Sequence, residues 1–97
     1  MRVYRLFGGG ARQFGLSWTT SDPRQMADWR DALGLPNSNS AEWLAIGELT
    51  DLSDVRERAA LPLDGNDGGG AQILVASPSN KIVIVEIVRM ETRDEGQ

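Results

Sequence analysis

The sequence contains no cysteine and no histidine, and these two absences remove most of the familiar catalytic designs. Without cysteine there is no disulfide framework, no thiol nucleophile and no thiolate zinc site. Without histidine there is no Ser-His-Asp triad, no His-paired general base and no imidazole metal ligand. We therefore expect no metal site, and any chemistry must use Arg, Lys, Asp, Glu, Ser, Thr, Tyr and the backbone.

Long apolar runs and an excess of positive charge are also missing. The longest apolar stretch lies within residues 81–88 and is interrupted by Glu86, whereas a membrane-spanning helix needs about 20 apolar residues. Fourteen acidic residues against ten basic ones give a net charge of −4, which argues against a nucleic-acid partner. A chain of 97 residues predicts a single domain over 1–97, with a polar tail at 91–97 that we expect to fray.

Apolar residues alternate or run continuously in several segments that are bounded by turn formers, as strands require. The strands predicted on this basis cover residues 3–7, 16–19, 42–49, 72–76 and 82–88.

Two segments are predicted to be helical. Asp22 is placed as an N-cap with Pro23 at the first helical position. Met26, Trp29 and Leu33 then form one apolar stripe, so a main helix is expected up to the break at Gly34. A second, short helix is expected from Ser53 to about Ala60. Strands and helices in this order predict an α+β fold rather than a wound parallel sheet.

Arg5 lies in an apolar strand and has two interpretations. Such an arginine usually sits at a sheet edge or in a surface ion pair. Alternatively, it presents a guanidinium fork on rigid backbone, able to bind a phosphate or ribose hydroxyls. Ser17 and Thr19 place two hydroxyls on one face of the next strand, with Trp18 on the other face, toward the core. The glycine clusters at 8–10 and 68–70 lack the spacing of a phosphate-binding loop and are interpreted as turn glycines.

Several short motifs, taken in order, resemble the Arg-Ser-Glu class of ADP-ribosyltransferases. The group that they resemble is the toxin domain at the C-termini of bacterial Rhs-repeat effectors that modify elongation factor Tu. The resemblance covers residues 3–88 and implies a small split β-sandwich with one main helix and one short helix. The motifs are Tyr4-Arg5, Gly15-Leu16-Ser17-Trp18-Thr19, Asp22-Pro23, 29–36, 60–66 with Gly68-Gly69, and 77–82.

These enzymes break the bond between nicotinamide and ribose in NAD+ through an oxocarbenium-like state. The resemblance therefore implies NAD as the cofactor, with Arg5 on its phosphate or ribose. Ser17 would fix the nicotinamide ribose, and Thr19 matches the next hydroxyl of the motif. Tyr4 and Trp29 complete the implied NAD site, although Trp29 has core packing as an equal alternative to stacking on nicotinamide.

The resemblance also implies a biological setting. The chain would be a secreted effector domain, delivered by type VI secretion, that acts in the cytoplasm of a recipient bacterium. Its protein substrate would be elongation factor Tu, whose modification blocks translation. A cognate immunity protein is implied as a second partner, and neither a nucleic acid nor a membrane is expected.

Gln72 stands where the family has its catalytic glutamate, so the catalytic set here is Arg5, Ser17 and Gln72. A glutamine keeps a hydrogen bond to a ribose hydroxyl but lacks the charge that stabilises an oxocarbenium ion. Losing such a partner costs about 3–4 kcal/mol, roughly 10²–10³ in rate. The sequence thus predicts a transferase that is catalytically disabled, either by a single Glu-to-Gln change in a lethal toxin or by natural divergence.

The catalytic carboxylate and the class of function each have a second interpretation. Glu86 or Glu48 could supply the carboxylate instead, although each fits an outward-facing strand position. The chain could be a non-enzymatic binding module or an immunity-type protein of the same fold, or an NAD+ glycohydrolase. Gly70, two residues before Gln72, offers no side chain for selecting an acceptor, so the loop over 64–70 is the expected contact with a protein substrate.

Overall fold

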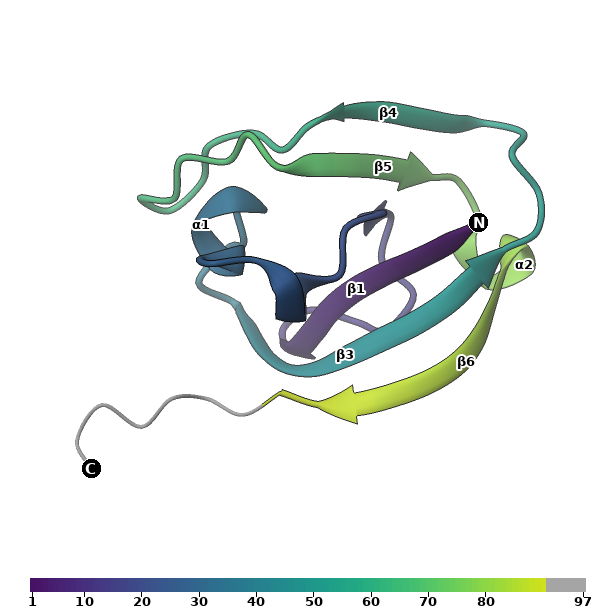
Figure 1. The fold of residues 1–97 in the computed structure, drawn as a ribbon, viewed down its shortest axis with the longest axis horizontal. Coiled ribbons are helices and arrows are strands. Elements are labelled where there is room, and N and C mark those ends of the chain that lie inside the picture. Colours follow the sequence, from purple (N-terminus) through teal and green to yellow (C-terminus); the bar gives the residue numbers. More distant parts are fainter. Residues whose placement is uncertain (91–97) are drawn as a thin grey trace.

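Two three-stranded antiparallel sheets form the protein in the computed structural model, which describes residues 1–90. The first sheet has the order β1-β3-β6 and the second the order β2-β5-β4. Figure 1 shows β4 and β5 facing the first sheet, with α1 at the end where β4 finishes and β5 begins. The strands are β1 (Arg2–Gly9), β2 (Ser17–Trp18), β3 (Asn39–Leu49), β4 (Val55–Ala59), β5 (Ala71–Val75) and β6 (Ile82–Arg89). The helical segments are the 3-10 turn η1 (Pro23–Gln25), α1 (Trp29–Ala32) and α2 (Pro78–Lys81).

Each face of the first sheet covers a separate apolar cluster. One cluster lies between the two sheets and joins Val3 and Ala45 to Trp18 and Ile73. Trp18 is 2% exposed, and its indole Nε1 donates to the Gly15 carbonyl over 2.8 Å. The other cluster lies on the opposite face, where the segment around α1 covers it; its buried members are Leu6, Ala41, Leu44 and Ile46.

One residue pair joins the two sheets directly. Tyr4 in β1 and Thr19, just after β2, exchange backbone hydrogen bonds of 2.8 and 2.9 Å. This pairing sets β2 of the second sheet against β1 of the first. The neighbouring residues Arg5 and Ser17 are therefore brought together.

The five strands predicted from the sequence are confirmed, with ends that differ by up to three residues. The short helix expected over 53–60 is wrong, because this segment contains β4. Its arginines and glutamate favour a helix intrinsically, but pairing with β5 from Val55↔Val75 to Ala59↔Ala71 overrides that weak preference.

The main helix is also wrong, and no helix within residues 1–90 reaches seven residues. Asp22 does act as an N-cap, since its Oδ1 accepts from the Arg24 N–H over 2.9 Å, but the turn ends at Met26 in an extended conformation. Asp28 then caps a new four-residue helix through the Asp31 N–H. Two aspartates that bond to nearby backbone thus divide the segment.

The α+β prediction is corrected accordingly: the described fold is mostly β, with two sheets and only short helices. The helices within residues 1–90 are all too short to cross a lipid bilayer. The fraying predicted for the tail at 91–97 lies outside the described residues.

Candidate functional site

Arg5, Ser17 and Gln72 line one pocket, although they come from three different strands. The pocket, here called the Arg5 pocket, has a volume of about 520 Å³, within the roughly 300–1,000 Å³ of many small-molecule sites. A smaller hollow of about 40 Å³ shares these three residues. The walls are mostly apolar, as in many small-molecule sites. The apolar lining includes Leu16, Leu33, Leu35, Leu61, Pro62 and Leu63.

Two backbone carbonyls hold the guanidinium of Arg5. Its Nε donates to the Arg12 carbonyl over 2.9 Å and its Nη1 to the Ser17 carbonyl over 3.0 Å. A Cβ at Gly15 would collide with this guanidinium, so the glycine makes room for it. Burial, and then the charge of Arg12, lower the pKa of Arg5 from its usual value. β1 is an edge strand, but Arg5 forms no ion pair in the described part of the chain, and its remaining N–H groups make no hydrogen bond within residues 1–90.

Gln72 is held by Arg58, which was not predicted to be a site residue. Arg58 of β4 lies opposite Gln72 of β5, and its Nε donates to the Gln72 Oε1 over 2.7 Å. Because the carboxamide oxygen is engaged, its NH₂ group is the part left for a ligand. Arg58 was missed because its segment was predicted to be helical. The spacing of Arg56 and Arg58 could have revealed it, since on a strand both point to one face.

The predicted hydroxyl groups occupy different positions. Ser17 lines the Arg5 pocket, and none of the hydrogen bonds found within residues 1–90 uses its hydroxyl. Thr19 is 3% exposed, and its Oγ1 accepts from the Ser21 N–H over 3.1 Å. Thr19 and Tyr4 line only the smaller hollow. Ser17 is thus the hydroxyl most open to a ligand.

Trp29 is not brought to the Arg5 pocket. It is the first residue of α1 and packs against the cluster that contains Leu6 and Leu44. The guanidinium carbon of Arg30 lies 5.6 Å from the centre of its ring. Of the two roles considered for Trp29, packing is the one that its contacts support.

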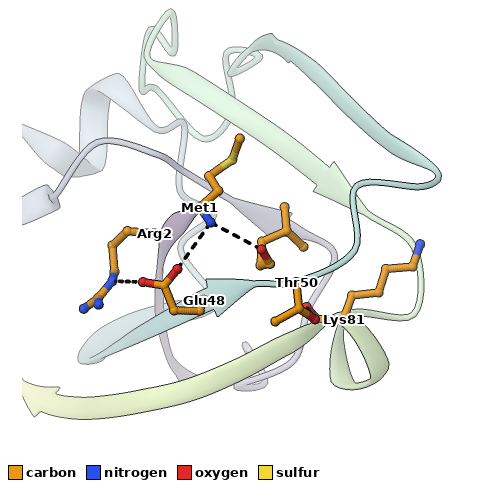
Figure 2. Close-up of polar contacts among 6 residues, drawn as sticks. Met1, Arg2, Glu48, Thr50 and Lys81 are labelled. Carbon is orange, nitrogen blue, oxygen red and sulfur yellow. Dashed lines mark hydrogen bonds and ion pairs between the residues drawn. The ribbon is translucent and has the colours of Figure 1, made fainter.

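The two glutamates considered in place of Gln72 also lie away from the pocket. Glu86 is exposed on β6, which confirms its outward-facing interpretation. Glu48 accepts from Arg2 Nε over 2.6 Å and pairs with the Met1 amino group over 3.3 Å (Figure 2). These two partners lower the pKa of the Glu48 carboxyl, Arg2 having the larger effect. Neither glutamate lines the Arg5 pocket.

The glycine-rich segment before Gln72 packs against α1. The N–H of Gly68 donates to the Asp31 carbonyl and that of Gly70 to the Ala32 carbonyl, both over 2.8 Å. Gly68 has φ of 75°, and a Cβ there would collide with the Ala60 carbonyl oxygen. These glycines serve a turn and a close approach, as interpreted from the sequence.

The chemistry of the pocket follows from its lining. Arg5, Arg58 and the NH₂ group of Gln72 offer positive charge and hydrogen-bond donors, and no aspartate or glutamate of the described residues lines it. Residues 1–90 contain no group of three acidic side chains placed to hold a metal ion. The polar part of the pocket is therefore suited to an anionic ligand.

Comparison with known proteins does not identify a function for this pocket. No family model, no curated protein and no solved structure matches the chain. The function must therefore be inferred from the residues of the pocket and their chemistry.

Proposed function

We propose that residues 3–88 form an ADP-ribosyltransferase-like toxin domain that binds NAD+ in the Arg5 pocket and has Gln72 in place of the catalytic glutamate. One observation carries this proposal. Arg5, Ser17 and Gln72, the three positions that match the Arg-Ser-Glu motif, lie on three strands and line the same pocket. This convergence is what the motif requires of its residues.

Each residue has a role in this proposal. The free N–H groups of Arg5 bind a phosphate or ribose of NAD+. The hydroxyl of Ser17 binds the nicotinamide ribose, and the NH₂ group of Gln72 donates to a ribose oxygen. In the transfer, the bond from ribose C1′ to nicotinamide breaks and nicotinamide leaves with the electron pair. The acceptor side chain of the protein substrate then attacks C1′ and loses a proton.

The disabled step is the development of positive charge on the ribose. A glutamate at position 72 would stabilise that charge, whereas the neutral carboxamide does not, so the present chain should be slower by about 10²–10³. The proposed substrate is elongation factor Tu of a recipient bacterium, reached after secretion, and the proposed second partner is an immunity protein. Both proposals depend on the family resemblance.

The test is to restore the charge. Gln72→Glu should label a protein in a bacterial lysate with ADP-ribose from NAD+ and should be toxic when expressed. Adding Arg5→Ala to that variant should abolish the labelling. Gln25→Glu, which makes the same change at an exposed position outside the pocket, should stay inactive. A Gln72→Glu chain that is harmless and labels nothing would show that the enzyme class is wrong.

A non-enzymatic binding module is the second candidate, and the bond from Arg58 to Gln72 favours it. This bond gives the carboxamide a defined place in the chain as it stands. Calorimetry with NAD+ separates the candidates: a disabled transferase binds the dinucleotide, and a protein-binding module does not. Release of nicotinamide by Gln72→Glu without protein labelling would instead identify an NAD+ glycohydrolase.

A further inference from the structure

The Arg5 pocket concentrates positive charge in a chain whose net charge is −4. Arg5 and Arg58 both line it, and Arg12 is close enough for its charge to lower the pKa of Arg5. Within the described residues no acidic side chain lines the pocket to balance these charges. An anion bound beside Arg5 would relieve the repulsion from Arg12.

The hydrogen-bonding groups of the pocket point to the same kind of ligand. The Oε1 of Gln72 already accepts from Arg58, so its NH₂ group, with two donors, is the least engaged part of the side chain. Asn39, also in the lining, donates to the Leu6 carbonyl and accepts from the Ala41 N–H, so it offers little more. The charged and amide side chains of the described lining thus offer more donors than acceptors. The pocket suits a ligand that brings acceptors and negative charge.

This polarity distinguishes two nucleotides that the proposed function involves. NAD+ and ADP-ribose share a diphosphate and two riboses, but NAD+ also carries a positively charged nicotinamide ring. A transferase with a glutamate would have a negative charge near that ring. The present pocket has an amide there, hydrogen-bonded to a second arginine.

We propose, on the basis of the proposed function, that the Arg5 pocket binds ADP-ribose more tightly than NAD+, and that Arg58 and Gln72 set this preference. Arg58 adds positive charge to the pocket and orients the amide of Gln72. The two ligands differ by one unit of charge, which in water-like surroundings corresponds to about a fivefold difference in Kd.

Calorimetry of the whole chain with ADP-ribose and with NAD+, at low salt, tests this preference. The unmodified chain should bind ADP-ribose about fivefold more tightly, and higher salt should reduce the difference. Arg58→Gln should weaken ADP-ribose binding about tenfold and bring the two Kd values together. Gln72→Glu, which adds a negative charge to the pocket, should weaken ADP-ribose binding about fivefold.

Arg56→Gln is the matched control. Arg56 lies two residues from Arg58 on β4, where a strand places both side chains on one face, but it lines a different hollow. The variant removes the same charge from the chain, so the ratio of the two Kd values should stay as it is in the unmodified protein. An equal effect of Arg56→Gln and Arg58→Gln would overturn the assignment to Arg58, because it would reflect overall charge.

The remaining outcomes separate this inference from the proposed function. If both nucleotides bind and NAD+ binds as tightly as ADP-ribose or more tightly, the preference is refuted while the proposed function stands. If neither nucleotide binds, the proposed function itself is refuted and the preference with it.

Discussion

The two charged regions of this protein are built in opposite ways. Where β1 begins and β3 ends, Arg2 and the Met1 amino group both bind the carboxylate of Glu48 (Figure 2). In the Arg5 pocket, the hydrogen bonds that the arginines make within residues 1–90 go to neutral acceptors: two backbone carbonyls and an amide oxygen. In the described part of the chain, the carboxylate of Glu48 offsets the charges of Arg2 and of the Met1 amino group, whereas no carboxylate pairs with Arg5 or Arg58. An anionic ligand in the Arg5 pocket would supply that missing negative charge.

A separate set of hydrogen bonds ties the chain together near the crossover from β3 to β4. The Lys81 carbonyl accepts from the N–H and the hydroxyl of Thr50, over 2.8 and 2.9 Å. The Lys81 ammonium reaches the Ser53 carbonyl. These bonds join α2 to the segment that leads into β4, so this region serves structure.

The largest expected effect comes from removing the buried indole between the two sheets. Trp18→Ala should lower the free energy of unfolding by about 3–5 kcal/mol, because it leaves a cavity in the cluster and an unpaired Gly15 carbonyl. Urea unfolding measures the loss. Trp43→Ala, at a half-buried position beside Arg89, is the control and should cost less. Equal losses would contradict the placement of Trp18 as the better packed of the two.

A smaller loss of stability is expected from a change at the Arg5 pocket. Gly15→Val places a side chain where the Arg5 guanidinium lies, so Arg5 must leave its two carbonyl partners. We expect a loss of about 1–2 kcal/mol in stability and at least about tenfold in nucleotide affinity. Gly10→Ala, whose added Cβ would lie 3.3 Å from the Ser38 Cβ, should leave affinity unchanged. Unchanged affinity in Gly15→Val would show that Arg5 does not contact the ligand.

The smallest effect should come from the matched region. The lowered pKa of Glu48 means that its charged form is favoured by folding, so its contribution to stability is present at neutral pH. That contribution is lost as pH falls through the lowered pKa. Glu48→Gln should therefore reduce the urea midpoint slightly at pH 7, and the difference from the unmodified chain should shrink as the pH is lowered through the acidic range. Glu57→Gln, at an exposed β4 position with no ion pair in the described residues, is the control and should leave the urea midpoint at pH 7 unchanged.

The sequence predicted strands better than helices for a physical reason. Alternating residues such as Val3 to Phe7 specify a sheet face on their own. The stripe of Met26, Trp29 and Leu33 is equally consistent with a short turn followed by a short helix. Whether the segment forms one continuous helix or a turn and a short helix depends on hydrogen bonds from nearby backbone N–H groups to Asp22 and Asp28.

The site was predictable in part. Arg5, Ser17 and Gln72 were chosen through a motif, and their convergence depends on the Tyr4–Thr19 pairing, which no local pattern specifies. Arg58 could not be found while its segment was assigned to a helix, because its partner Gln72 is set by strand register alone. Trp29 was placed at the site by analogy, and contacts with the second apolar cluster hold it elsewhere.

The single pairing of Tyr4 with Thr19 also has a mechanical consequence. Arg5 belongs to one sheet and Gln72 to the other, so a nucleotide that contacted both residues would link the two sheets at this junction. By thermodynamic linkage, a nucleotide that bound the paired state of this junction more tightly than the unpaired state would stabilise the pairing by that same factor. A change that disrupts the pairing would then lower the affinity of the pocket for that nucleotide.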